Sequence, residues 1–433
     1  MAIDNKDKKV LKSSIEREQN EVACSAECEK IKGSKNLNVP HLRFPEFTGE
    51  WKKSTIGSLS TKVGSGVTPR GGETVYKSEG HSFVRSQNVG WGHLQLDDIA
   101  FIDKETHLRQ KNTELQLDDV LLNITGASIG RSALVNKQIA GGNVNQHVCI
   151  IRTKDNLVPA FLCNFLLSNH GQKQIDSFQA GGNRQGLNFE QIRSIKITIP
   201  STKEQTKIAT LLHLIDERIA TQNKIIEDLK KLKSAIIERH YNQAEKQTVF
   251  IADLGEPFNV GNLSKDDLSE TGKPCIIYGE LFTTYGETIS QVESHTNKKE
   301  GMTLSKKGDL LFPTSTTVDA ISLIAPSFIN IDGVILGGDM FGIHINPNYN
   351  AQYLSYSFNH IANRQLAKYA KGSTIIHLHY TDIENAKLLL PSLEEQNRMA
   401  KCLVSLDAKI NIENIFISLL KSQKIYFLYQ MFI

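Results

Sequence analysis

Five glycine-flanked segments in the first half of the chain carry amide, hydroxyl and basic side chains. Asn and Gln can form two hydrogen bonds with adenine, Arg can do so with guanine, and loops of Gly, Ser and Thr let backbone N–H groups approach phosphates. One such segment alone is more often a solvated turn. Five in one region indicate a surface that contacts DNA. The candidate residues are Thr68, Arg70, Lys77, Arg85, Ser86, Gln87, Asn88, Asn123, Thr125, Arg131, Asn145, Gln146, Asn183, Arg184 and Asn188.

The second half of the chain has a different polar set at corresponding places. Because different side chains pair with different bases, the two sets predict two different targets. The candidate residues are Tyr278, Thr283, Thr284, Tyr285, Thr314, Ser315, Thr316, Thr317, Lys371, Ser373, Thr374 and His379.

Patterns typical of catalysis or of a metal site are missing from the sequence. It contains no P-loop, no His-Glu-x-x-His and no paired Cys-x-x-Cys. Residues 346–349 (Asn-Pro-Asn-Tyr) resemble the Asn-Pro-Pro-Tyr loop of amino-methyltransferases, but no glycine-rich cofactor loop precedes them, which favours a turn between a strand and a helix. His344, His377 and His379 lack matching Cys or carboxylate ligands. We therefore predict no catalytic residue, no metal site and no cofactor bound by this chain.

These residues lie in a sequence that contains an internal repeat of two copies. Residues 200–205 (Pro-Ser-Thr-Lys-Glu-Gln) reappear as residues 391–396 (Pro-Ser-Leu-Glu-Glu-Gln), a shift of 191 positions. At that shift, residues 181–237 share 17 identities with their partners, where background composition would give roughly three. The period indicates a duplicated module of domain size. Weaker upstream matches pair residues 119–122 with 309–312 at a shift of 190, and residues 141–143 with 337–339 at a shift of 196.

A long helix is predicted in the C-terminal part of each copy. Each begins with a Ser-x-x-Glu capping box, in which Ser201 or Ser392 accepts a backbone N–H and the glutamate reaches back to the cap. Apolar residues then recur in steps of four and three, the spacing of a coiled-coil seam. The seam residues are Ile208, Leu212, Ile215, Ile219, Ile226 and Leu229 in the first helix, and Met399, Leu403, Leu406, Ile410, Ile417 and Leu420 in the second.

Polar residues interrupt both seams at the same two positions. They are Gln222 and Lys233 in the first copy, and Glu413 and Lys424 in the second. Polar seam residues cost stability and specify register, so the matched positions favour pairing of the two helices with each other. The alternative is that each helix packs only on its own domain.

The N-terminal part of each copy is predicted to be an α/β domain. The fold class is therefore α+β, with two such domains in tandem. Short strands are expected at residues 120–124, 148–152, 195–199, 275–278, 321–324 and 341–345, and helices at residues 160–178 and 351–370. The predicted organisation is a polar extension over residues 1–36, a first domain over 37–200, a spacer helix over 201–247, a second domain over 248–391 and a distal helix over 392–433.

Composition is consistent with this organisation. Of 433 residues, 39% are hydrophobic, enough for real cores, and no apolar run is long enough to span a membrane. Six irregularly spaced cysteines and a charged start without a secretory signal indicate a reduced, cytoplasmic protein without a membrane partner. The formal net charge of +3 neither requires nor excludes a nucleic-acid partner.

Over residues 37–433 the chain resembles the specificity subunit of type I restriction-modification systems. No single motif carries the resemblance; the ordered set, present twice, does. Residues 39–47 are similar to the leading segment of such subunits, residues 83–88, 119–130 and 145–152 to the first recognition domain, residues 277–281 and 308–317 to the second, and the two Pro-Ser-x-x-Glu-Gln helices to the spacers. The family pattern lacks the extension over residues 1–36.

The resemblance implies two target-recognition domains held apart by antiparallel helices. Each domain would read one half of a split double-stranded DNA site, and the helix pair would set the gap, as dimer spacing sets half-site separation. This chain would be non-catalytic. Two methyltransferase subunits, docked on the helices, would bring S-adenosylmethionine and flip an adenine out of the stack. Motor-nuclease subunits would bring ATP and Mg.

Two other functions remain open at this point. One is a two-headed protein-interaction scaffold without DNA specificity, because polar loops alone are weak evidence for DNA binding. The other is an amino-methyltransferase that acts through residues 346–349.

Overall fold

The computed structural model describes residues 38–71, 75–179, 186–298 and 301–433. The predicted extension over residues 1–36 and the candidates Asn183 and Arg184 lie outside these ranges. The chain divides into two compact units: the first ends at Ile215 and takes in Ser422–Ile433, and the second is Asp216–Lys421. We call residues 38–199 the first domain and residues 247–390 the second domain. No helix among the described residues is long and apolar enough to cross a membrane.

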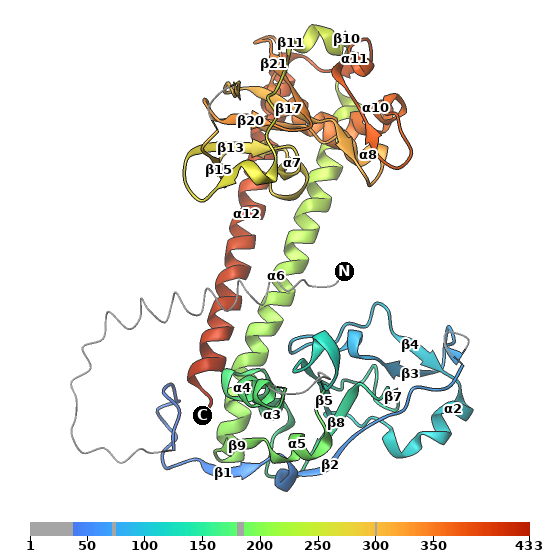
Figure 1. The fold of residues 1–433 in the computed structure, drawn as a ribbon, viewed down its shortest axis with the longest axis vertical. Coiled ribbons are helices and arrows are strands. Elements are labelled where there is room, and N and C mark those ends of the chain that lie inside the picture. Colours follow the sequence, from blue (N-terminus) through green and yellow to red (C-terminus); the bar gives the residue numbers. More distant parts are fainter. Residues whose placement is uncertain (1–37, 72–74, 180–185, 299–300) are drawn as a thin grey trace, which may run out of the picture. The chain divides into compact units, whose positions relative to one another are not determined.

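The first domain is built on a curved sheet with strand order β2-β8-β5-β6 and a second sheet with order β4-β3-β7 (Figure 1). The central strands β5 and β8 are buried on both faces, which explains their continuous apolar runs. The strands are β1 (Lys52–Thr55), β2 (Ser60–Ser65), β3 (His81–Val84), β4 (Ala100–Ile102), β5 (Val120–Asn123), β6 (Ser132–Leu134), β7 (Asn143–Val144), β8 (Val148–Thr153) and β9 (Lys196–Ile199), and β1 pairs with β9 antiparallel.

Helices cover one face of the first domain, and their bounds differ from the prediction. The single helix expected over residues 160–178 is two helices. Ser168 is extended, with ψ at 162°, and its Oγ accepts a hydrogen bond from the N–H of Gly171 at 3.3 Å, so it ends one helix and caps the next. The helices are α2 (Lys104–Arg109), α3 (Pro159–Leu167), α4 (Asn169–Ser177) and α5 (Phe189–Ser194).

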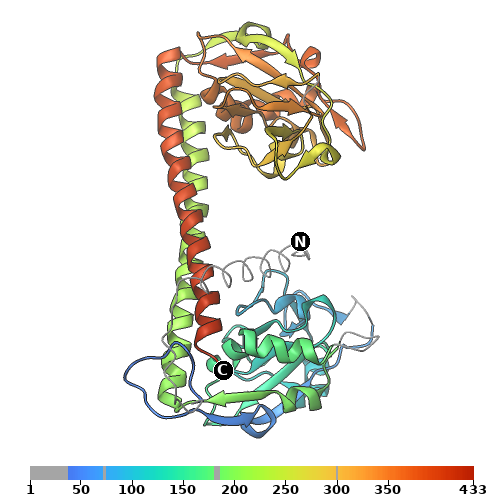
Figure 2. The same cartoon turned by 60° about the vertical axis from the view of Figure 1, so that its left-hand side comes forward.

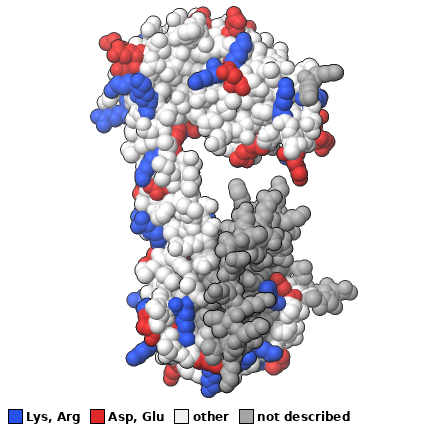
Figure 3. Space-filling view, turned by 90° about the vertical axis from the view of Figure 1, so that its left-hand side faces the viewer, with Lys and Arg blue, Asp and Glu red and all other residues white. Residues whose placement is uncertain are grey.

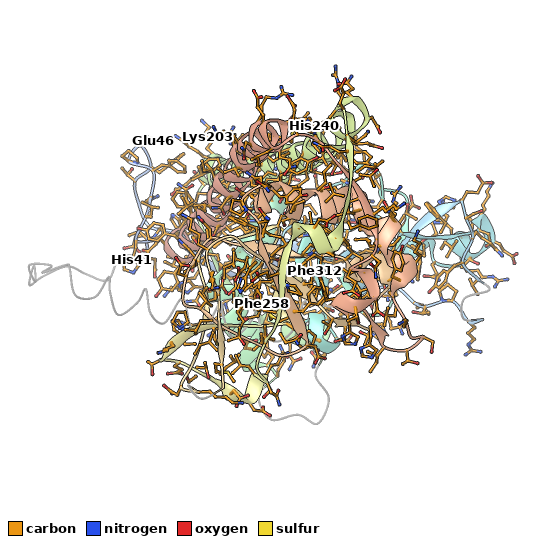
Figure 4. The ribbon with its side chains drawn as sticks, turned by 90° about the horizontal axis from the view of Figure 1, so that it is seen from above. His41, Glu46, Lys203, His240, Phe258 and Phe312 are labelled. Carbon is orange, nitrogen blue, oxygen red and sulfur yellow. The ribbon has the colours of Figure 1, made fainter. Side chains whose placement is uncertain are left out.

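The second domain has the same arrangement of two sheets, and each sheet contains five strands. Their strand orders are β11-β21-β17-β19-β14 and β12-β15-β13-β20-β16. Phe258 and Phe312, labelled in Figure 4, come from β11 and β17, and the Phe312 ring stacks on Phe341 with centroids 4.9 Å apart. The bounds are β10 (Gln247–Phe250), β11 (Gly255–Asn259), β12 (Leu268–Ser269), β13 (Lys273–Ile277), β14 (Thr288–Ile289), β15 (Ser294–Thr296), β16 (Thr303–Leu304), β17 (Asp309–Pro313), β18 (Ser315–Thr316), β19 (Ser327–Ile329), β20 (Ile335–Gly337), β21 (Met340–Ile345), β22 (Ile376–His377) and β23 (Lys387–Leu390).

Two predictions about the second domain are wrong. Residues 321–324 are not a strand: they lie in and directly after α8 (Ala320–Leu323), because the Asp319 carboxylate caps this turn by accepting from the N–H of Ser322 at 2.8 Å. The helix expected over residues 351–370 is interrupted by a π-helical turn. Its parts are α9 (Ala351–Ser357), the π turn (Phe358–Ala362), α10 (Asn363–Leu366) and a 3-10 turn (Ala367–Tyr369); the other helices are α7 (Glu280–Thr283) and α11 (Tyr380–Ile383).

Strand pairing also corrects the upstream alignment of the repeat. β5 pairs with β8 through Leu121 and Ile150, and β17 pairs with β21 through Leu311 and Gly342. These equivalent pairs give shifts of 190 on one strand and 192 on the other. The segment before β21, residues 337–339, therefore corresponds to residues 145–147 and not to residues 141–143. The predicted shift of 196 rested on shared glycines alone.

The long helices are α6 (Thr202–Gln243) and α12 (Leu393–Gln430), which lie side by side in Figures 1 and 2. All twelve predicted seam residues are buried or half-buried. The helices run antiparallel: in the second unit the buried Gln222 amide contacts the Glu413 carboxylate, and His240 lies 3.3 Å from Glu395. Gln222 and Glu413 are each other's counterparts in the repeat, so this pair of matched polar positions meets in the seam, whereas Lys233 of the other pair donates to Asp407.

Each helix also packs into a domain core, so the predicted pairing is accompanied by domain packing, and the alternative that each helix packs only on its own domain is wrong. In the first unit Ile208 and Leu212 join the domain core together with Phe432 from the chain's end. In the second unit Ile237 of α6 and Leu403 of α12 join the core of the second domain.

Of the two hydrogen bonds predicted for each capping box, only the one accepted by the serine hydroxyl is present. The hydroxyl groups of Ser201 and Ser392 accept from the N–H groups of Glu204 and Glu395, at 3.3 and 3.4 Å. Neither glutamate reaches back to its cap. The Glu204 carboxylate accepts instead from Arg43, and the Glu395 carboxylate from Arg398.

Candidate nucleic-acid interface

The polar loops of the first domain meet at one end of its sheets. The Gln146 side chain accepts from the N–H of Thr68 at 3.0 Å, and its amide nitrogen lies 3.1 Å from the His147 ring. The other ring nitrogen of His147 lies 2.7 Å from the Thr125 hydroxyl. Thr125 forms a backbone bridge with Gly186. Four segments that are distant in sequence therefore form one continuous polar surface.

Two predicted contact residues belong to the framework under this surface. Asn123 is fully buried, and its amide donates to the carbonyl of Ser86 at 2.8 Å. Asn88 is also buried; its amide donates to the carbonyl of Gln95 and its oxygen accepts from the N–H of Arg85. Because both side chains are buried and both amide nitrogens donate to backbone carbonyls inside the domain, the prediction that Asn88 and Asn123 contact DNA is wrong. They instead position the loop that carries Ser86.

The remaining first-domain candidates differ in their hydrogen bonds within the domain and in the exposure of their side chains. Arg85 donates to the backbone oxygen of Asp98 at 2.8 Å, and Asn188 caps α5, accepting from the N–H of Gln191 at 2.8 Å. Asn145 is buried and accepts from the N–H of His147. Ser86, Thr125 and Arg131 are half-buried, and the exposed members are Arg70, Lys77, Gln87 and Gln146.

The second domain brings its loops together in the same way. The Ser315 hydroxyl donates to the Asp339 carboxylate at 3.0 Å, at the positions that Thr125 and His147 occupy in the first domain. The N–H of Thr314 donates to the carbonyl of Asp339 at 2.8 Å. β18 then pairs antiparallel with β22, Ser315 opposite His377. The loop after β17, the loop before β21 and the hairpin around β22 thus form one surface.

The second-domain candidates also divide into framework and surface. Thr314 and Ser315 are buried, and the Tyr285 hydroxyl accepts from the N–H of Glu293 at 3.1 Å. The Lys371 ammonium group pairs with Asp382 at 2.5 Å but stays largely exposed. Thr316 is half-buried. The exposed members are Tyr278, Thr283, Thr284, Thr317, Ser373, Thr374 and His379.

One functional element of the framework was not predicted. The buried carboxylate of Asp119 accepts from Arg152 through two nitrogens at 2.7 Å each, and the equivalent Asp309 lies 2.6 Å from the His344 ring. Each aspartate stands at the start of the central strand that leads into the polar loops: Asp119 directly precedes β5, and Asp309 is the first residue of β17. The match between residues 119–122 and 309–312 was the available signal, but the partner residues are distant in sequence.

Charge is mixed on these domains. On the face shown in Figure 3, lysine and arginine side chains of the second domain are interspersed with acidic ones. Among the described residues no group of three or more His, Cys, Asp or Glu side chains could hold a metal ion. In residues 346–349, the N–H groups of Asn348 and Tyr349 both donate to Asn346, which forms the predicted turn between β21 and α9.

Comparison with known proteins identifies the fold and the family. The chain is 21% identical over 405 residues, 88% of its length and 92% of the relative's, to a Methanocaldococcus jannaschii protein assigned as the specificity subunit of type I restriction enzyme MjaX. It is 23% identical over 203 residues, 43% of this chain and 41% of the relative, to the EcoKI specificity subunit of Escherichia coli. The crystal structure of a type I restriction-modification S subunit from M. genitalium superposes with a TM-score of 0.56 at 15% identity, covering 91% of this chain and 99% of that one.

The family profile matches both copies of the repeat. The type I restriction modification DNA specificity domain matches residues 48–231 and 243–421, each a domain with its following helix. The two matches cover most of the chain. The chain therefore belongs to the family of type I restriction-modification DNA specificity subunits.

Proposed function

We propose that this chain is the DNA-recognition subunit of a type I restriction-modification complex and that each domain reads one half of a split site. The observation that carries the proposal is the polar surface formed twice on one scaffold, by Thr68, Thr125 and Gln146 in the first domain and by Thr317 and Thr374 in the second. The same framework with different exposed side chains suits two targets of different sequence.

The helix pair is proposed to set the gap between the half-sites. A buried polar pair in a coiled-coil seam specifies register at a cost in stability, and Gln222 with Glu413 is such a pair. Fixed register gives a fixed rod length, and a fixed rod length gives one spacing between two DNA-reading surfaces.

A docking face for the methyltransferase partner is proposed on the side of α12 opposite the seam. Val404, Ala408, Ile412, Ile415 and Leu419 follow one another at steps of three or four and are all exposed, with Ile412 at 58% and Leu419 at 62%. An apolar stripe on the outer side of a paired helix favours contact with a further helix. The corresponding residues of α6 are polar: His213, Glu217, Thr221, Lys224 and Asp228.

Catalysis is proposed to belong to the partners. The described residues offer framework hydrogen bonds and DNA-reading groups but no arrangement of nucleophile, base and cofactor loop. S-adenosylmethionine would be bound by the methyltransferase subunits, and ATP and Mg by the motor-nuclease subunits.

Methylation mapping tests the proposed function. Random-sequence duplex DNA is exposed to the assembled methyltransferase, and the modified positions are sequenced. We expect two short motifs separated by one gap length. A single continuous motif, or no motif in the presence of partner, contradicts the proposal. Insertion of seven residues within both α6 and α12 should change the gap and leave the motifs the same.

Charge substitution tests the docking face. Ile412→Lys combined with Ile415→Lys should abolish co-purification with the methyltransferase subunit, because two ammonium groups would have to be desolvated in the interface. The matched control is Thr221→Lys, which places a lysine at the counterpart of Ile412 on the polar helix and should leave the complex intact. Equal loss in both variants would contradict the assignment of the face to α12.

A further inference from the structure

Three exposed apolar side chains stand in the polar surface of the second domain. Val318 is 73% exposed, Ile321 46% and Ile375 49%. Each is β-branched, and large apolar side chains are seldom that exposed in such proximity without a binding role. The proposed DNA contacts are polar side chains, so these three residues have no role among them.

The local fold brings these three residues into one neighbourhood. β18 pairs with β22 in a register that places Thr316 opposite Ile376, and continuing this register by one residue brings Ile375 opposite Thr317, which adjoins Val318. The hairpin behind Ile375 is tight: Gly372 has a φ of +111°, and a Cβ there would lie 2.0 Å from the Ile375 carbonyl oxygen.

Ile321 is brought to the same place by α8. The Asp319 carboxylate caps this single turn, and its Ser322 partner is bonded through both the N–H and the hydroxyl, each at 2.8 Å. Val318 and Ile321 are three residues apart across the cap, and α8 packs against β18 and β22. A rigid turn therefore presents the apolar group.

In the described part of the first domain, the loop equivalent to Val318 and Ile321 exposes no large apolar side chain. There the 3-10 turn Gly126–Ser128 follows Thr125, and Gly126 and Ala127 are its exposed residues. The scaffold thus does not require apolar side chains at this position. Their presence at this loop of the second domain therefore points to what that domain binds.

We propose that Val318, Ile321 and Ile375 form the contact site for a thymine 5-methyl group in the major groove of the half-site read by the second domain. The inference rests on the proposed function. The thymine methyl is the apolar feature among the base edges of the major groove, and apolar side chains read it. β-branched side chains are restricted at χ1, so little rotamer freedom is lost on contact.

The surroundings favour DNA as the occupant. Thr317 and Thr374 place hydroxyl groups beside the apolar group, and the Lys371 ammonium is exposed on the same hairpin. Hydroxyl and ammonium groups suit base edges and phosphates. The apolar group is also continuous with the loops joined by Ser315 and Asp339.

Replacement of thymine by uracil, which lacks only the 5-methyl group, tests the site. Duplexes carrying the sequence found by methylation mapping are made with uracil at one thymine position at a time and bound to the assembled complex. Removing one buried methyl should weaken binding about fourfold at one position in the half-site of the second domain. If no position in that half-site responds while specific binding persists, the inference fails and the proposed function stands. If specific binding itself is absent, the proposed function fails.

Variants assign the effect to these residues. In the chain carrying Val318→Ser, Ile321→Ser and Ile375→Ser, thymine and uracil duplexes should bind equally. Leu389→Ser is the matched control, because Leu389 is an exposed apolar residue on β23; the fourfold preference should persist there. A thymine preference retained by the triple variant would place the methyl contact elsewhere and overturn the inference.

Discussion

The two domains share a framework but are connected to the long helices by different charged groups. In both, a buried aspartate stands at the start of the central strand, and the strand ends in the polar loops. In the first unit the start of α6 carries the ionic connection through Glu204. In the second unit the connection lies further along the helices, at Lys233 and Asp407.

The connection in the first unit is a bidentate ion pair. Arg43 donates to both carboxylate oxygens of Glu204, at 2.7 and 2.8 Å, and the Trp51 indole N–H donates to the same carboxylate at 3.3 Å. Glu204 is 1% exposed. The segment before β1 is thereby attached to the first turn of α6.

The connection in the second unit joins three elements. The buried Lys233 ammonium of α6 donates to Asp407 of α12 at 2.7 Å and to Glu287, just before β14, at 2.9 Å. Tyr356 donates to Asp407 at 2.5 Å, and the His360 ring lies 2.8 Å from Glu287. Equivalent sequence positions therefore do not imply equivalent interactions: the repeat preserves the apolar framework, and the ion pairs differ between the copies.

Removal of the Lys233 charge should have the largest effect. Lys233→Met leaves two carboxylates near each other and partly buried, so the second unit should lose about 3–5 kcal/mol of stability. Urea-induced unfolding measures the loss, and hydrogen exchange assigns it to the second unit. Lys231→Met is the control, because Lys231 is exposed and pairs with Glu227 one turn away, so its loss should leave the stability close to that of the parent chain. A similar loss in both variants would contradict the role of the buried cluster.

The two buried aspartates offer a second comparison. Arg152→Leu should cost about 3 kcal/mol, since the Asp119 carboxylate loses two charge-assisted hydrogen bonds. His344→Leu should cost about 1 kcal/mol, because His344 supplies a single hydrogen bond to Asp309 and the apolar replacement preserves contact with Phe258. Thermal or urea unfolding of both variants checks the order. A larger loss for the histidine variant would show that the two aspartates are not equivalent.

The glutamates at the helix starts give a sharper contrast, because they occupy the same place in the repeat. Glu204→Ala leaves the Arg43 guanidinium without its partner and should cost about 2–3 kcal/mol. Glu395 has a side chain that is 38% exposed, so Glu395→Ala should cost clearly less stability than Glu204→Ala. Equal losses would mean that helix capping, which both positions share, is their main contribution.

Sequence reasoning predicted features that depend on local periodicity. The coiled-coil seam and most strands follow from spacing within a short window, and the repeat follows from matching the chain against itself; the seam and all predicted strands but that over residues 321–324 are present. The partner of Glu204 could not be predicted in this way, because Arg43 is 161 positions away and competes successfully with the local cap. A charged partner held by tertiary structure forms a stronger contact than the cap N–H.

The candidate interface was predicted by residue type but not by exposure. Asn88 and Asn123 have the same chemistry as Gln146, yet their amides bind backbone carbonyls inside the domain. Burial of an amide depends on which loops pack together, and a single sequence does not contain that information. Ile321 was missed for the opposite reason: residues 321–324 were expected to form a strand, but the Asp319 cap places Ile321 in α8, where its side chain is exposed.

The pH dependence of the second unit should be the smallest of these differences. Burial alone would raise the pKa of Glu287, but its contacts with His360 and Lys233 lower it to about 2. A lowered pKa contributes stability that is complete above the ordinary glutamate value of about 4.5 and is lost as the pH falls toward 2. Glu287→Gln should therefore reduce stability by about 1–2 kcal/mol at pH 7, and the difference from the parent chain should shrink between pH 4.5 and 2. Urea unfolding at a series of pH values measures this difference. If this stability difference stays constant down to pH 2, the variant has lost packing and not charge. The ion pairs of Glu287 would then contribute no stability to the second unit, in contrast to the Arg43–Glu204 pair of the first unit.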